Sequence, residues 1–325
     1  MQEFLKDLDQ DQLSAVKYCD GSQLVIAGAG SGKTRVLTYK IAYLLSIGVK
    51  PWNILALTFT NKAANEMKER IGILLKEDAA RRINMGTFHS IFYRILRSNV
   101  NEINYRPNFT IYDENDSKVL VKNIMKEFGV DDKKYSPGQI LNTISYAKNH
   151  LITVDEFLMN DRTNIIGNIY NEYVQRCHIA NVMDFDDLLI KTYELFSKKP
   201  DVLDNYADLF KYILVDEYQD TNYAQQKIIE LLYKKNVCIC LVGDDAQSIY
   251  SFRGANLEYM LSFPQKNNFK IFKLERNYRS TKNIVAAANS LIKHNEHQIH
   301  KDVYSNNDEG GKVRLKVAHS DREEA

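Results

Sequence analysis

The chain has 325 residues, of which 44% are hydrophobic, and its 43 basic and 42 acidic residues leave a net charge of +1. This length suits two domains or slightly more, and the balanced charge means that any basic surface for nucleic acid must be local. The sequence has no signal-peptide pattern and no run of 18 apolar residues, and its four scattered cysteines indicate neither a disulfide framework nor a zinc site. We therefore expect a soluble protein of the cytoplasm.

An apolar run at residues 23–27 leads into a segment that reads Ala-Gly-Ala-Gly-Ser-Gly-Lys-Thr over residues 27–34. This order predicts a strand, a tight turn and a helix from about Lys33, which is the context of a phosphate-binding loop. The glycines let backbone N–H groups turn around an anion, and the helix N-terminus adds positive charge. Lys33 is expected to reach the β- and γ-phosphates of a nucleotide, and the Thr34 hydroxyl to hold Mg²⁺. The predicted phosphate-binding residues are Ala27 (in place of the usual first glycine), Gly28, Ala29, Gly30, Ser31, Gly32, Lys33, Thr34 and Arg35.

Short apolar runs, each followed by polar residues, predict a buried parallel sheet. This is the pattern of an open α/β fold, in which ligands gather beyond the carboxyl ends of the strands. The predicted strands are residues 24–27, 54–59, 83–85, 212–215 and 237–242.

Between residues 90 and 210 the pattern becomes helical, for example at 117–128 and 165–177, with one weak strand candidate at 109–112. This stretch separates the phosphate loop from the next motif by far more residues than a simple mononucleotide fold needs. We therefore predict a motor domain formed by residues 1–89 and 211–276, with an inserted helical domain at 90–210. Residues 277–325, with a helix at 282–293 and a strand-like 312–317, are too few for an independent core and are expected to be the start of a further domain.

The strand at residues 212–215 ends in the adjacent carboxylates Asp216 and Glu217. Beside a phosphate loop, Asp216 is expected to hold Mg²⁺ through water. Glu217 would then orient a water molecule and remove its proton for attack on the γ-phosphate.

The next strand leads into a segment rich in polar and aromatic residues, 244–255. Gln247 can both donate and accept a hydrogen bond, which suits a sensor of the γ-phosphate. Arg253 can neutralise charge on the transferring oxygens. Tyr250 and Phe252 are of the type that stacks on unpaired bases, although such aromatic residues also pack in cores.

In this order, the motifs resemble those of the superfamily 1 DNA helicases of the UvrD/Rep/PcrA group, over essentially the whole chain. Residues 8–12 resemble the family's adenine-reading motif, with Gln12 as the reader. Residues 274–280 resemble the motif in which a tyrosine, here Tyr278, stacks on adenine and an arginine, here Arg279, touches the γ-phosphate.

Two further segments, residues 58–64 and 86–90, resemble family motifs that contact single-stranded DNA, and residues 183–189 resemble the stretch that closes the inserted domain. The resemblance thus predicts catalytic and DNA-binding sets. The catalytic set is Lys33, Glu217, Gln247, Arg253 and Arg279. The DNA-binding set is Phe59, Thr60, Asn61, Lys62, Thr87, His89, Tyr250 and Phe252.

The resemblance implies a RecA-like P-loop NTPase with an inserted helical domain and the start of a second RecA-like domain. It implies an ATP hydrolase that uses ATP and Mg²⁺ to move 3′-to-5′ on single-stranded DNA and to unwind duplex junctions, with repair or replication accessory proteins as partners. Two alternatives are a nucleotide-dependent DNA-binding module without unwinding and the motor part of a helicase–nuclease subunit.

Two departures from the family pattern matter. Phe252 stands where the family usually has tryptophan, which preserves stacking. Motifs of the second motor domain, including its final γ-phosphate arginine, have no counterpart in these residues. We therefore expect residues 1–325 alone to bind nucleotide weakly and not to unwind DNA.

Overall fold

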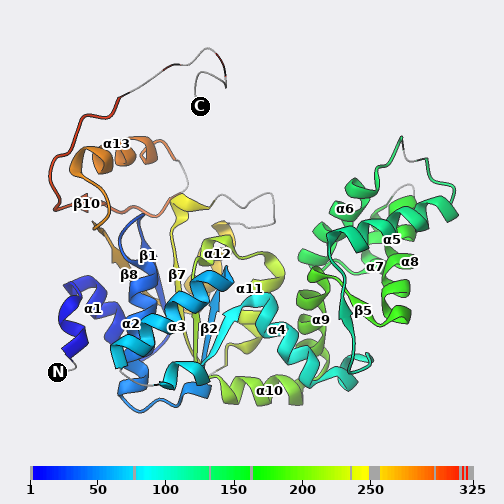
Figure 1. Ribbon diagram of the computed structural model, residues 1–325, viewed down its shortest axis with the longest axis horizontal. Coiled ribbons are helices and arrows are strands. Elements are labelled where there is room, and N and C mark those ends of the chain that lie inside the picture. The colour runs from blue at the N-terminus through cyan, green and yellow to red at the C-terminus, as the bar shows by residue number, and fades with distance from the viewer. Residues whose placement is uncertain are drawn as a thin grey trace.

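The computed structural model describes residues 3–75, 78–131, 133–161, 164–234, 236–248, 257–295, 298–314, 317 and 320. Within them, a six-stranded sheet has the order β3-β2-β6-β7-β1-β8, and every pair of neighbouring strands is parallel. Helices cover both faces of the sheet (Figure 1). The predicted α/β class with a parallel sheet is confirmed.

All five predicted strands are present, with ends that differ from the prediction by at most two residues. The sixth strand, β8, was not predicted; it pairs with β1 at the edge of the sheet. Most of its side chains are exposed, so it lacks the continuous apolar run that marks the central strands. The strands are β1 (Gln23–Ala27), β2 (Ile54–Thr58), β3 (Asn84–Thr87), β6 (Tyr212–Val215), β7 (Cys238–Gly243) and β8 (Lys270–Leu274).

Successive side chains of the four central strands β1, β2, β6 and β7 enter different hydrophobic cores, as the two-residue period of a strand requires. On β1, Leu24 and Ile26 face one core, whereas Val25 and Ala27 face the other. The second core is completed by α1 (Gln10–Lys17), α2 (Lys33–Ser46) and α3 (Asn61–Leu75). The first core is covered by α4 (Phe88–Ser98), α9 (Phe185–Lys198), α11 (Tyr223–Leu232) and α12 (Leu257–Lys266).

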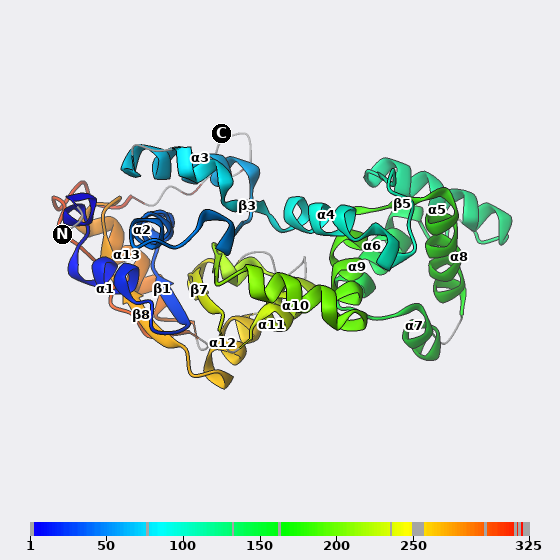
Figure 2. The same ribbon diagram turned by 90° about the horizontal axis from the view of Figure 1, so that it is seen from below.

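The chain between β3 and β6 is mostly helical and extends to one side of the sheet (Figure 2). Its outer part, here called the helical lobe, has a separate core formed by α5, α6 and α8. In contrast, α4, α9 and α10 share the core of the sheet, so the insertion and the sheet form continuous packing. The lobe helices are α5 (Glu114–Glu127), α6 (Pro137–Asn149), α7 (Val154–Asn160) and α8 (Ile165–Ala180), followed by α9 and α10 (Pro200–Leu209).

The helices predicted at 117–128 and 165–177 are α5 and α8, and the weak strand candidate at 109–112 contains β4 (Thr110–Ile111). This short strand pairs in parallel with β5 (Val182–Met183). The remaining short elements are 3₁₀ helices at Glu3–Asp7, Pro51–Asn53, Asp78–Arg82, Val100–Ile103, Tyr218–Asp220 and Asp245–Gln247.

After the sheet, β9 (Arg276–Asn277) is followed by α13 (Lys282–Ile292) and by β10 (Tyr304–Ser305), which pairs with β9. In Figure 1, α13 lies beyond the carboxyl end of β1. The predicted helix at 282–293 is present. The predicted strand at 312–317 is not formed at residues 312–314, while 315 and 316 lie outside the described residues. No helix in the described part of the chain is both long and apolar enough to cross a membrane.

Candidate nucleotide site and adjoining groove

The glycine-rich loop joins β1 to α2 and needs glycine at two positions with left-handed backbone. Gly30 has φ +70° and Gly32 has φ +90°, and Gly32 is the N-cap of α2. Ser31 closes the turn, because both its N–H (3.2 Å) and its hydroxyl (2.7 Å) donate to the Gly28 carbonyl. A Cβ at Gly30 would lie 2.8 Å from the Cβ of Arg279, so the later chain approaches the loop too closely for a side chain. The loop therefore has the backbone shape of a phosphate cradle.

Three predicted catalytic side chains converge beside this loop. Lys33 at the start of α2 places its Nζ 3.1 Å from Glu217 Oε2, just after β6. The same Nζ donates to Gln247 Oε1, beyond β7, at 3.0 Å. Parallel strands bring their carboxyl ends to one edge, which explains how segments more than 180 residues apart in the sequence meet here.

Asp216 and Thr34 line a cavity of about 310 Å³ together with Glu217 and Gln247. Burial and the neighbouring Glu217 carboxylate raise the pKa of Asp216 to about 7. The Glu217 N–H, the charge of Lys33 and a hydrogen bond with Thr34 offset part of this rise. A hydroxyl and a carboxylate at the mouth of a phosphate loop are hard oxygen donors, as Mg²⁺ prefers. The residues present therefore fit this metal.

Glu217 has a strained backbone, with φ 47° and ψ 46°. For a residue other than glycine this left-handed conformation costs about 1–2 kcal/mol. It is held by contacts on both sides: the Glu217 N–H donates to Asp216 Oδ1 at 3.1 Å, and Gln219 Nε2 donates to Glu217 Oε2 at 2.9 Å. Strain maintained by its surroundings is typical of functional sites.

Gln219, which the sequence analysis did not identify, connects the ends of two strands. Its Oε1 accepts the backbone N–H of Asp244 at 3.0 Å, while its Nε2 contacts both Glu217 and Asp220. The side chain is buried, so it fixes the Glu217 carboxylate relative to β7. Its position within the Asp-Glu-Tyr-Gln-Asp segment was the only available signal.

The residues predicted to bind the base lie at the other side of the loop. Gln12 Nε2 donates to the Ser31 carbonyl at 3.0 Å, and its buried Oε1 has no hydrogen-bond partner among the described residues. The Tyr278 hydroxyl donates to Asp9, and burial with this bond raises the pKa of Tyr278 to about 12. Arg35 Nη2 donates to the Asp7 carbonyl at 2.8 Å. The structure thus brings Gln12, Arg35 and Tyr278 to one end of α1 and α2.

The segment after β8 lies against the phosphate loop. Asn277 Nδ2 donates to the Ala29 carbonyl at 2.7 Å, and the Tyr278 N–H donates to the Gly30 carbonyl at 2.9 Å. The side chain of Arg279 is exposed, and no hydrogen bond or ion pair within the described residues joins it to Lys33 or Glu217. Because the Arg279 Cβ lies beside Gly30, its side chain starts next to the phosphate loop, and its contact with the γ-phosphate stays a prediction.

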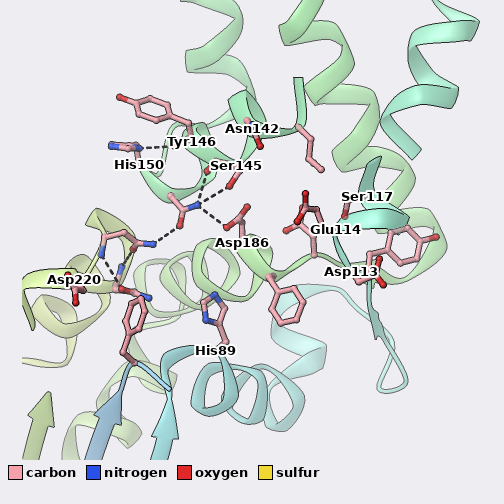
Figure 3. A pocket seen from close by; sticks show the side chains of 18 residues that line it. His89, Asp113, Glu114, Ser117, Asn142, Ser145, Tyr146, His150, Asp186 and Asp220 are labelled. Atoms are coloured by element: carbon pink, nitrogen blue, oxygen red, sulfur yellow. Dashed lines mark hydrogen bonds between the residues drawn. The ribbon is translucent and has the colours of Figure 1, made fainter. Parts of the chain in front are cut away.

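A larger groove of about 760 Å³ lies between the sheet edge and the helical lobe (Figure 3). Its walls carry aromatic rings: His89 and Phe185 pack edge-to-face at 5.9 Å, and Tyr146 and His150 stack at 3.9 Å. Burial lowers the pKa of His89, which favours its neutral form. The other groove-lining residues include several acids: Asp113, Glu114, Asp184, Asp186 and Asp220. This combination suits the flat faces of bases and disfavours phosphates.

The groove and the nucleotide cavity share two residues, Phe59 and Asp220, which line both. Thr60 lines the nucleotide cavity but not the groove. Thr87 is used as the N-cap of α4, where its Oγ1 accepts the N–H of Ser90 at 3.2 Å. Asn61 and Lys62 at the start of α3 are exposed, and neither lines the two cavities.

Three predicted residues, Tyr250, Phe252 and Arg253, lie outside the described residues. Conversely, the sequence analysis did not assign Tyr146 or Phe185 to a site. Phe185 lies within the Met-Asp-Phe-Asp-Asp segment that resembled a family motif, but residue type alone did not separate it from a core aromatic.

A parallel sheet whose first strand enters a Gly-Lys-Thr loop and whose nearby strand ends in Asp-Glu is the fold of a P-loop nucleotide-binding protein. The UvrD/REP helicase N-terminal domain model matches residues 8–268, and the UvrD-like helicase C-terminal domain model matches residues 272–325. The chain belongs to the UvrD/REP helicase family.

Curated relatives agree with this assignment. The ATP-dependent DNA helicase PcrA of Staphylococcus epidermidis is 44% identical over 330 residues, which cover 100% of this chain and 45% of the relative. The protein of the same name from Bacillus subtilis is 46% identical over 316 residues, which cover 96% of this chain and 43% of the relative. That from Staphylococcus aureus is 44% identical over 333 residues. The chain therefore spans less than half the length of these relatives.

Proposed function

We propose that this chain forms the nucleotide-hydrolysing part of an ATP-dependent DNA helicase that moves 3′-to-5′ on single-stranded DNA. The observation that carries the proposal is the convergence of Lys33, Glu217 and Gln247 on a cavity that shares walls with an aromatic groove. The names of the curated relatives support the same activity.

In this proposal the phosphate loop and Lys33 hold the phosphates of ATP, and the unpartnered Oε1 of Gln12 accepts a hydrogen bond from the adenine amino group. Thr34 and Asp216 would hold Mg²⁺, which neutralises charge on the phosphate oxygens when bound. A γ-phosphate competes for Lys33 Nζ, which now pairs with Glu217. Release of that pair would leave the Glu217 carboxylate free to accept a proton from the attacking water.

Single-stranded DNA would place its bases in the groove, against Phe59, His89 and Phe185. Stacking does not depend on base identity, so sequence preference should be slight. Tyr250 and Phe252 remain proposed DNA contacts on the basis of the sequence. Arg253 and Arg279 remain proposed to neutralise charge on the γ-phosphate.

We further propose that residues 1–89 and 211–276 act as one motor domain, with 90–210 as its insertion and 277–325 as the start of a second domain. The shared hydrophobic core of the first two ranges supports the motor unit. The separate core of α5, α6 and α8 supports the insertion.

The test is ATP hydrolysis by the purified chain with Mg²⁺, measured with and without oligo(dT), and strand displacement on a 3′-tailed duplex. Stimulation by oligo(dT) is expected, whereas a nucleotide-dependent binding module without a motor role would show none. Residues 1–325 alone are expected not to unwind the duplex, because two alternating DNA-gripping domains are needed. Absence of nucleotide binding by the wild-type chain would contradict the proposal.

A further inference from the structure

One buried lysine in the last described part of the chain is not used by the site described above. After α13 the chain returns to the carboxyl edge of the sheet, where the Lys301 side chain is only 6% exposed. Its Nζ lies 2.9 Å from Asp244 Oδ1 and also pairs with Asp245. The N–H of Ile299 donates to the second oxygen of Asp245 at 2.7 Å. Two buried carboxylates are therefore compensated by one lysine and one backbone N–H from the same segment.

Asp244 connects this lysine to the predicted γ-phosphate sensor. Its Oδ2 accepts Gln247 Nε2 at 2.8 Å, and Gln247 Oε1 in turn accepts Lys33 Nζ at 3.0 Å. An amide has one donating and one accepting end, so donation to Asp244 directs the accepting end toward Lys33. A continuous series of contacts thus runs from Lys301 through Asp244 and Gln247 to the phosphate loop.

We propose that Lys301 is a positioning residue for Gln247: it holds and neutralises Asp244, and thereby sets how Gln247 faces the phosphate cavity. The inference rests on the proposed function and deepens it, because a γ-phosphate is the ligand that would compete for the donors of both Lys33 and Gln247. When the Gln247 amide turns from Asp244 to a phosphate oxygen, Lys301 keeps the buried carboxylate compensated. ADP has no γ-phosphate to compete for these donors, so Lys301 should favour the binding of ATP over that of ADP.

The same segment also contacts the loop directly. A Cβ at Gly28 would lie 2.8 Å from Cγ2 of Val303, two residues after Lys301. A change in the contacts of Gln247 is therefore transmitted to a segment that packs on the phosphate loop. This gives the region after α13 a physical means to respond to the nucleotide.

The experiment compares Lys301→Met and Lys301→Arg in the chain of 325 residues, with Lys282→Met as the matched control. Lys282 lies on α13 and makes an exposed ion pair with Glu309 at 3.5 Å, so its loss should change nothing. Dissociation constants are measured with fluorescent ADP and a fluorescent non-hydrolysable ATP analogue, and kcat and KM with ATP. Thermal melting shows whether each variant is folded.

Lys301→Met is expected to weaken the preference for the ATP analogue over ADP by ~5-fold or more and to lower kcat by ~10-fold. ADP affinity should be nearly unchanged, and KM for ATP should rise in step with the dissociation constant of the analogue. Lys301→Arg should restore most of both the preference and kcat. A folded Lys301→Met chain with wild-type discrimination and kcat would overturn the role of Lys301.

If Lys301→Met does not fold, the double variant Lys301→Met/Asp245→Asn is used in its place for the same measurements. The double variant removes one buried charge of each sign. Impaired discrimination supports the proposal, and wild-type discrimination overturns it. Failure of the wild-type chain and the Lys282→Met control to bind either nucleotide is a different outcome. It would show that the proposed function itself is wrong, and the inference would fall with it.

Discussion

Lys33 and Lys148 are both buried lysines that contact acidic side chains, one at the carboxyl edge of the sheet and the other where the helical lobe meets α9. Lys148 is 1% exposed, and its Nζ lies 2.7 Å from both Asp184 Oδ2 and Asp187 Oδ1. The Tyr173 hydroxyl adds a bond of 2.8 Å to Asp184. The two carboxylates raise the pKa of Lys148 well above its usual value despite the opposing effect of burial.

Lys33 has a different environment. Its side chain is 10% exposed, and its partners are one carboxylate and one neutral amide beside an open cavity. Its carboxylate partner, Glu217, has a strained backbone. Burial and the Glu217 carboxylate raise the pKa of the adjacent Asp216, and the charge of Lys33 offsets this only in part. In the closed, fully paired cluster, loss of one partner leaves a buried charge uncompensated, whereas the strained cluster open to a cavity can exchange partners with a ligand.

Replacing Lys33 should have the largest effect on activity. Lys33→Ala is expected to abolish ATP hydrolysis and to weaken nucleotide binding sharply, because the loop loses the ammonium group that lies between Glu217 and Gln247. Turnover and nucleotide affinity are the measurements, and the melting temperature should change little. Wild-type-like turnover would remove Lys33 from the site.

Replacing Lys148 should instead affect stability. Lys148→Met leaves two buried carboxylates without a cation, which should lower the free energy of unfolding by about 3–5 kcal/mol. Chemical denaturation measures this loss. Lys199→Met, which breaks an exposed ion pair with Glu102 at 2.8 Å, is the control and should cost at most about 1 kcal/mol. Equal losses in both variants would contradict the distinction between closed and open clusters.

Glu217→Gln should reduce hydrolysis by ~10²-fold or more while nucleotide binding stays nearly intact, because the amide keeps the shape but cannot act as a base. Single-turnover kinetics separate the chemical step from binding. If turnover hardly changes, another group activates the water.

The aromatic groove should contribute less per residue. Phe59→Ala and Phe185→Ala are each expected to weaken binding of oligo(dT) by about 1–3 kcal/mol, the usual value of one base stack. Phe128→Ala is a suitable control, because Phe128 is an exposed aromatic residue outside the groove. Fluorescence anisotropy with labelled oligo(dT) gives the affinities, and undiminished binding by the double variant would exclude this path.

The smallest effect is expected at Asn149, whose hydrogen bonds join the helical lobe to α9 and α11. Asn222 Nδ2, at the start of α11, donates to Asn149 Oδ1 at 2.6 Å, and Asn149 Nδ2 donates to Asp186 Oδ1 at 2.8 Å. Asn149→Ala should cost about 0.5–1.5 kcal/mol, the value of a typical hydrogen bond. We expect the ratio of DNA-stimulated to unstimulated hydrolysis to fall more than the unstimulated rate. An unchanged ratio would make these hydrogen bonds purely structural.

The central strands and the phosphate loop were predictable from the sequence because continuous apolar runs and glycine spacing are local signals. The edge strand β8 was missed because partial exposure removes that signal. Lys148 and Lys301 were also missed, since nothing local distinguishes a lysine that will be buried from one on the surface. Their partners lie 36 and 57 residues away in the sequence, at Asp184 and Asp244.

The same limit applied to the site. Adjacent carboxylates after an apolar strand predicted Asp216 and Glu217, and the structure does bring Glu217 to Lys33. The left-handed backbone of Glu217 and the role of Gln219 depend on packing between β6 and β7, which no residue pattern encodes. Thr87, which was predicted to contact DNA, also caps α4 through its hydroxyl, and its DNA contact stays a prediction.

Phe59 and Asp220 line the walls of both cavities, so a ligand that displaces either side chain alters the free energy of binding in both places. Thermodynamic linkage makes such an effect reciprocal: the factor by which DNA tightens ATP must equal the factor by which ATP tightens DNA. Two titrations, each with the other ligand saturating, would therefore have to give one and the same coupling constant.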